Sequence, residues 1–112
     1  MNLIKENVTQ AYKVEGEKYS FAAVAQYIFG GKVTDINSGT VRRKDNGVGS
    51  VSFSASLNGG PMMAVATQSD NILDNLSVQF SGVKQDEQAA ILDEIKAFIK
   101  AIEADINKVS SI

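Results

Sequence analysis

The chain has 112 residues, a formal net charge of −2, 44% hydrophobic residues and 21% charged residues, a balance that predicts one globular domain over residues 1–112. It contains no histidine and no cysteine. Serine–histidine and cysteine–histidine hydrolysis, disulfides and cysteine-ligated zinc are therefore excluded for this chain. We expect a protein that is not an enzyme and that holds no metal or other cofactor.

The first ten residues predict neither export nor membrane insertion. Their apolar run is only three residues long before Lys5 and Glu6, too short for the core of a signal peptide. Elsewhere no apolar stretch approaches the roughly 20 residues that cross a bilayer. A cytoplasmic location without membrane contact is the expectation.

Residues 20–31 (SFAAVAQYIFGG) fit two structures. Ser20 as an N-cap, the alanine-rich interior and the closing glycine pair favour a short helix over residues 20–30. The alternation of Phe21, Ala23, Ala25, Tyr27 and Phe29 fits a strand instead, and Glu15-Gly16 before it resembles a hairpin turn. The helix is the preferred prediction, and the strand remains the alternative.

The middle of the chain predicts an antiparallel meander. A short strand is expected at Lys32–Ile36, and Asp45-Asn46-Gly47 is typical of a tight hairpin joining Thr40–Lys44 to Val48–Leu57. Apolar and polar residues alternate in Val48–Leu57, as in a strand with one buried face. The same alternation recurs at Leu76, Val78 and Phe80 and, more weakly, at Met63, Val65 and Thr67, after a reversal at Asn58-Gly59-Gly60.

A long amphipathic helix is predicted over Gln85–Lys108. Its apolar residues recur at steps of three and four: Ile91, Ile95, Phe98, Ile102, Ile106 and Val109. Acidic residues lie toward its start and lysines toward its end, as the helix dipole favours. In the polar connection before the third meander strand, Ile72 and Leu73 are expected to fold back onto the core.

These elements predict the α+β class: an antiparallel meander of about four strands packed against the long C-terminal helix, with a second short helix at residues 20–30. The second helix is a candidate cover for the opposite sheet face. That face is polar or small but uncharged, whereas solvated sheet faces usually carry lysine and glutamate. It is the candidate interaction face, formed by Ser50, Ser52, Ser54, Ser56, Ser77 and Gln79.

One basic run, Arg42-Arg43-Lys44, lies beside the predicted hairpin tip. Two arginines and a lysine on a protruding ribbon can clamp phosphates, and the three tyrosines of the N-terminal third can stack on bases. The charge bias is mild, because residues 1–56 hold 7 basic and 5 acidic groups. The run is therefore a candidate nucleic-acid contact, and a solubilising hairpin tip is the simpler interpretation.

Other chemistry-bearing patterns are weak. No glycine-rich phosphate loop occurs, and the segment Asp70–Asn75 lacks the central glycine and closing glutamate of a calcium loop. The leading hypothesis is a small interaction or assembly protein of bacterial or phage type that binds copies of itself or another protein. The alternative is a small nucleic-acid-binding protein, of the kind found in phage or mobile elements, that uses the basic hairpin.

Overall fold

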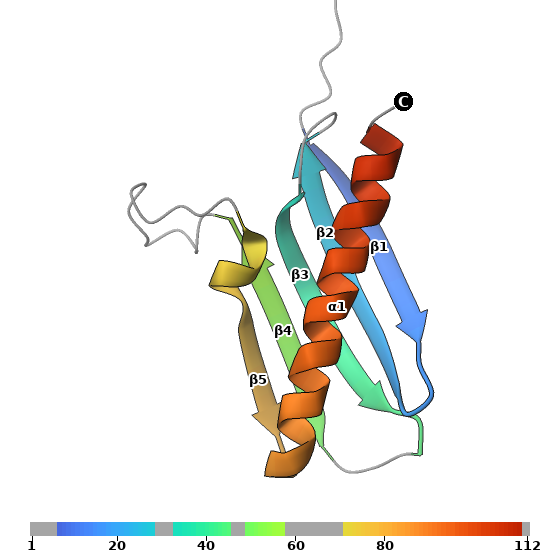
Figure 1. Cartoon of the computed structure of the whole chain (residues 1–112), viewed down its shortest axis with the longest axis vertical. Helices are drawn as coiled ribbons and strands as arrows, with labels where there is room; N and C mark the ends of the chain where they lie inside the picture. The colour runs from blue at the N-terminus through green and yellow to red at the C-terminus, as the bar shows by residue number, and fades with distance from the viewer. Residues whose placement is uncertain (1–6, 29–32, 46–48, 58–70, 111–112) are drawn as a thin grey trace, which may run out of the picture.

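The computed structural model describes residues 7–28, 33–45, 49–57 and 71–110. These residues form two layers, a five-stranded antiparallel sheet and one long helix lying across one of its faces (Figure 1). The strands follow the order β1-β2-β3-β4-β5, so each pairs with its neighbour in the chain. The predicted α+β meander packed against a C-terminal helix is confirmed, with five strands in place of about four.

The elements have the following bounds. The strands are β1 (Asn7–Glu15), β2 (Tyr19–Ile28), β3 (Val33–Arg43), β4 (Ser50–Ser56) and β5 (Ser77–Ser81). The helices are the 3-10 helix η2 (Ile72–Asn75) and the α-helix α1 (Gln85–Ser110). Among the described residues, no helix is long and apolar enough to cross a membrane.

The predicted helix at residues 20–30 is wrong, because residues 20–28 belong to strand β2, while residues 29–30 lie outside the described residues. The strand hydrogen-bonds to β1 on one side and to β3 on the other. Its alternate side chains are buried beneath α1: Tyr19, Phe21, Ala23, Ala25 and Tyr27. Two ladders and this buried row outweigh the modest helix preference of the alanines. The segment therefore belongs to the sheet and covers neither of its faces.

Strand β3 contains most of two segments that were predicted as separate strands, Lys32–Ile36 and Thr40–Lys44, from Val33 to Arg43. The pairing with β4 shifts register between Ile36 and Gly39, where Ser38 has a φ of 55°. Gly39 lies opposite Phe53, and a Cβ built there would come within 2.5 Å of the Phe53 ring. A bulge with a glycine beside it therefore keeps one strand running through this break in the alternation.

Strand β1 was not predicted, and several predicted features lie outside the described residues. These features are the turn residues 46–48, the reversal at 58–60 and the strand around residues 63–67. The antiparallel pairing that the hairpin prediction requires is present, since β3 pairs with β4. The bounds of β4 also agree with the alternation seen in Val48–Leu57.

The core lies between the sheet and α1. The predicted apolar stripe of the helix is buried where it is described: Ile91, Ile95, Phe98, Ile102 and Ile106. Ile99, beside this stripe, is also buried. Phe98 packs between Phe21 of β2 and Phe53 of β4, with ring centroids 5.9 and 6.4 Å away. Ile72 of η2 is fully buried and Leu73 packs against the core, which confirms that this connection folds back onto the sheet.

Candidate interaction surface

The sheet has an outer face, turned away from α1, to which β4 and β5 contribute a row of small polar side chains. Strand pairing sets Ser50 opposite Ser81, Ser52 opposite Gln79 and Ser54 opposite Ser77. The structure thus brings the predicted interaction residues together in one patch. We call this patch the serine face: Ser50, Ser52, Ser54, Ser56, Ser77 and Gln79. All of them are exposed except Ser56, which is half-buried.

The uncharged surface extends onto β2, whose outward residues are Ser20, Ala22, Val24 and Gln26. Charge on the outer face stands at the two ends of β3, as Asp35 and Arg42, and on the edge strand β1. Within the described part of the chain, no element lies over this face (Figure 1). The outer face is therefore an open, mostly neutral surface with its charges at the margins.

A shallow hollow of about 260 Å³ marks the centre of the serine face. It lies at the bulge of β3, where Ser38 and Gly39 adjoin Ser52, Ser54, Ser77 and Gln79. Gly39 has no side chain, and Phe53, which pairs with it, also contributes to the lining of this hollow. The serine face is thus slightly concave where the two predicted halves of β3 meet.

The basic run does not form one cationic surface. Arg42 lies on the outer face, whereas Arg43 contacts two carboxylates: Nε and Nη2 donate to Asp45 at 3.1 and 2.8 Å, and Nη1 lies 3.5 Å from Glu87. Lys44 pairs with Glu15, its Nζ lying 3.4 Å from Oε2. Two of the three cations are therefore paired with carboxylates of the protein, and Lys44 shares Glu15 with Lys13.

The tyrosines also lie away from the open face. Tyr19 and Tyr27 are buried beneath α1, and Tyr12 is half-buried on the same side of the sheet. The expectation that their rings could stack on bases at an open sheet is therefore wrong, because the alternation of β1 and β2 turns all three toward the helix. The same neighbourhood raises the pKa of Tyr12, through burial and its 2.8 Å hydrogen bond to Asp105.

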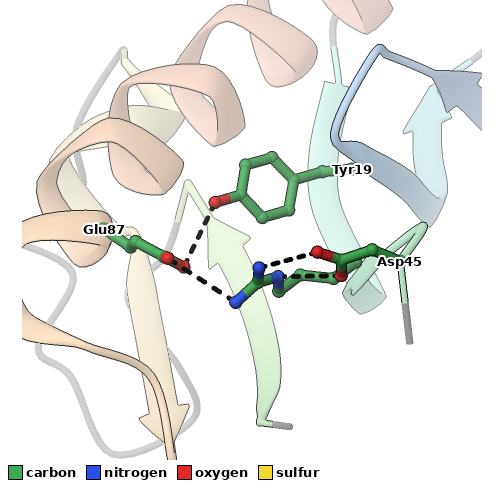
Figure 2. Close-up of polar contacts among 4 residues, drawn as sticks. Tyr19, Asp45 and Glu87 are labelled. Carbon is green, nitrogen blue, oxygen red and sulfur yellow. Dashed lines mark hydrogen bonds and ion pairs between the residues drawn. The ribbon is translucent and has the colours of Figure 1, made fainter. Parts of the chain in front are cut away.

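A polar cluster that sequence reasoning missed joins the first turn of α1 to β2 and β3 (Figure 2). The Tyr19 hydroxyl donates to Glu87 Oε2 at 3.3 Å, and the same carboxylate pairs with Arg43. Burial, and then the charge of Glu87, raise the pKa of Tyr19. The sequence signal was faint, since Tyr19 and Glu87 are 68 positions apart.

The cluster borders a hollow of about 250 Å³ with apolar walls from Val41, Val51, Val83 and Ile91. Its charges are arranged as pairs, with Arg43 between Asp45 and Glu87. Such a chain of contacts fixes the start of the helix to the sheet. Asp86 and Glu87 stand in the first helical turn, as predicted.

The other acidic residues form no metal site where they are described. No group of three or more carboxylates suited to a metal ion occurs among the described residues, and Asp70 of the weak calcium pattern lies outside them. Comparison with known proteins adds no assignment, because no family model, no curated protein and no solved structure matches this chain.

Proposed function

We propose that this protein is a non-catalytic assembly protein that forms homo-oligomers, and that the serine face is a surface where copies meet. The observation that carries the proposal is that this face is exposed, polar and free of charge. An ordinary solvated sheet face carries lysine and glutamate, which resist close approach by another protein. The serine face has no lysine or glutamate side chain to resist such an approach.

The chemistry of the serine face suits contact between identical surfaces. Serine side chains are short, so little rotamer entropy is lost when they are buried. Each hydroxyl both donates and accepts a hydrogen bond, so it finds partners on a copy of the same surface. Because the patch carries no charge, two copies meet there without the like-charge repulsion that opposes self-association of a charged face.

Sedimentation velocity of the full chain over a wide concentration range tests the proposal. We expect species larger than the monomer, and we expect the double variant Ser52→Lys with Ser54→Lys to shift them toward smaller species. Two lysines introduced there must lose their hydration or repel their counterparts on the other copy. A chain that sediments only as a monomer at every concentration contradicts the proposal.

A matched control separates the serine face from a general effect of charge. Ala97 and Ala101 are exposed on α1, on the opposite side of the molecule from the serine face. The double variant Ala97→Lys with Ala101→Lys adds the same two charges and is expected to keep the oligomers of the unaltered chain. Equal loss of oligomers in both variants would mean that net charge controls assembly and that the serine face is not the contact.

No observation favours the alternative of nucleic-acid binding through the basic hairpin. Arg43 and Lys44 are paired with carboxylates, and the tyrosines face the helix. Arg42 is left on the outer face as a single cation near the neutral surface. One such contact is far fewer than the several phosphate contacts that give a protein useful affinity for nucleic acid at physiological salt.

A further inference from the structure

The first strand of the sheet offers a long open edge. β1 pairs with β2 through nine consecutive residues without a register shift, and β2 is its only partner in the described structure. β5, at the opposite edge, has five residues. An edge strand carries unpaired backbone N–H and C=O groups along its outer side, so a regular strand of this length is a template for another strand.

The features that usually protect such an edge are weak in β1. The strand contains no proline and no bulge. Its charged residues, Lys13 and Glu15, stand at one end and pair with each other at 3.1 Å. Beside them Val14 is 47% exposed, the one large hydrophobic side chain that is exposed in the described part of the chain. The edge therefore presents an apolar side chain beside the outward backbone groups of an edge strand, and the Ala11 carbonyl accepts a hydrogen bond from the exposed Gln10 side chain at 3.3 Å.

The sequence of β1 is complementary to itself. When two copies run antiparallel with Ala11 opposite Ala11, all nine residues find a partner. On the helix side, Val8 then faces Val14 of the second copy and Gln10 faces Tyr12. On the outer side, Thr9 faces Lys13. No like charges meet, and the exposed valine gains an apolar neighbour, as favourable cross-strand pairs require.

The position of α1 agrees with this pairing. The hydrogen bond from Tyr12 to Asp105 holds the C-terminal half of the helix near the middle of β1, while the strand end that carries Val14 is less covered (Figure 1). An antiparallel arrangement places the open end of each strand beside the covered end of the other. Because opposite residues must share a face, both helices lie on one side of the joined sheet.

We propose that β1 is the site where a second copy of this chain adds to the sheet, by antiparallel pairing about a two-fold axis at Ala11. The inference rests on the proposed function, because it assumes that the protein assembles with itself. The contact between two β1 strands is separate from the serine face. The two-fold axis sets the outer faces of both copies on the same side of the joined sheet, with the two serine faces toward its opposite ends and the strands β1, β2 and β3 of each copy between them.

Cysteine cross-linking tests the register, since the chain contains no cysteine of its own. Directly opposite residues of an antiparallel pair have Cα atoms about 4.5–5.5 Å apart, within the range that a disulfide spans. The variant Ala11→Cys is expected to form a covalent dimer under mild oxidation. A mixture of Thr9→Cys and Lys13→Cys is expected to form the mixed dimer, identified by its mass.

Each of the latter two variants alone serves as a matched control. Residues Thr9, Ala11 and Lys13 are all exposed, so the substitutions leave the fold intact. In the proposed register, Thr9 lies four positions from Thr9 of the second copy, about 14 Å along the strand, beyond the reach of a disulfide. We expect no dimer from Thr9→Cys alone or from Lys13→Cys alone. Equal cross-linking of these controls and Ala11→Cys would overturn the register.

The variant Val14→Glu tests the contact without cross-linking. It places a carboxylate opposite Val8 of the second copy, and symmetry repeats the pair, so the dimer dissociation constant should rise about tenfold or more.

If sedimentation shows oligomers but Ala11→Cys does not cross-link, the edge contact is wrong and the proposal of self-assembly stands. A serine-face contact alone gives that result, because packed sheets are about 10 Å apart. If only monomers sediment, both proposals fail.

Discussion

Replacing Phe98 with alanine tests the packing of α1 against the sheet most directly. Phe98 is 7% exposed and lies between the rings of Phe21 and Phe53, with centroid distances of 5.9 and 6.4 Å. Removing a buried phenylalanine costs about 3–5 kcal/mol, and because the side chain also loses two aromatic pairs we expect no less than the middle of that range, about 4 kcal/mol. Because a domain has about 5–15 kcal/mol of stability in total, the variant should lose a large share of it.

The measurement is urea unfolding at fixed protein concentration, followed by far-UV circular dichroism because the chain has no tryptophan. In thermal unfolding, a loss near 4 kcal/mol should lower the melting temperature by about 15 °C, at about 4 °C per kcal/mol. Phe80→Ala is the matched control, since Phe80 is half-buried on the edge strand β5, and about half the loss is expected there. A loss below about 1 kcal/mol for Phe98→Ala would refute the assignment of this helix face to the core.

Three further predictions concern single positions. Gly39→Ala should lower the free energy of unfolding by about 1–3 kcal/mol, because its Cβ would lie 2.5 Å from the Phe53 ring. Gly82→Ala should cost about 1 kcal/mol for a different reason, since Gly82 has a φ of 69° but room for a methyl group. Both are measured by urea unfolding. Above pH 10, the free energy of unfolding should fall less steeply with pH in Tyr12→Phe than in the unaltered chain, as measured by unfolding at a series of pH values.

The sign of the pH effect follows from the direction of the pKa shift. The folded protein raises the pKa of Tyr12 above its ordinary value of 10.0. Above pH 10 the unfolded chain therefore releases a proton that the folded chain keeps, and the free energy of unfolding falls as pH rises. A Tyr12→Phe variant with an unchanged alkaline slope would show that this hydroxyl is not held as described. For the glycines, a change within a few tenths of a kcal/mol would contradict the close approach at Gly39 or the strain at Gly82.

The sequence predicted best those elements whose apolar residues face one uniform core. The helix stripe repeats at three and four residues over its whole length, and Val51, Phe53 and Ala55 alternate with serines in β4. Such patterns need no knowledge of distant contacts. The serine face followed from the same alternation, because fixing one side of β4 also fixes the other.

Prediction from the sequence failed where contacts between distant segments decide the structure. β1 was missed because it lies at the margin of the helix cover, where its inner face mixes Val8 and Tyr12 with the polar Gln10. Residues 20–30 were assigned to a helix because alanines suit both structures, and only the ladders on both sides select the strand. The cluster around Tyr19 and Glu87 depends on a contact between distant segments, which local spacing does not encode.

The order of the elements also bears on how the protein is made. In a meander, each strand pairs with the one synthesised just before it, so the sheet can form step by step as the chain leaves the ribosome. Its apolar face, however, has no cover until Gln85–Ser110 has been translated. During that interval a growing chain exposes Phe21, Phe53 and their neighbours to solvent. A nascent chain that stalls before α1 therefore exposes an apolar sheet face to chaperones or to other nascent chains.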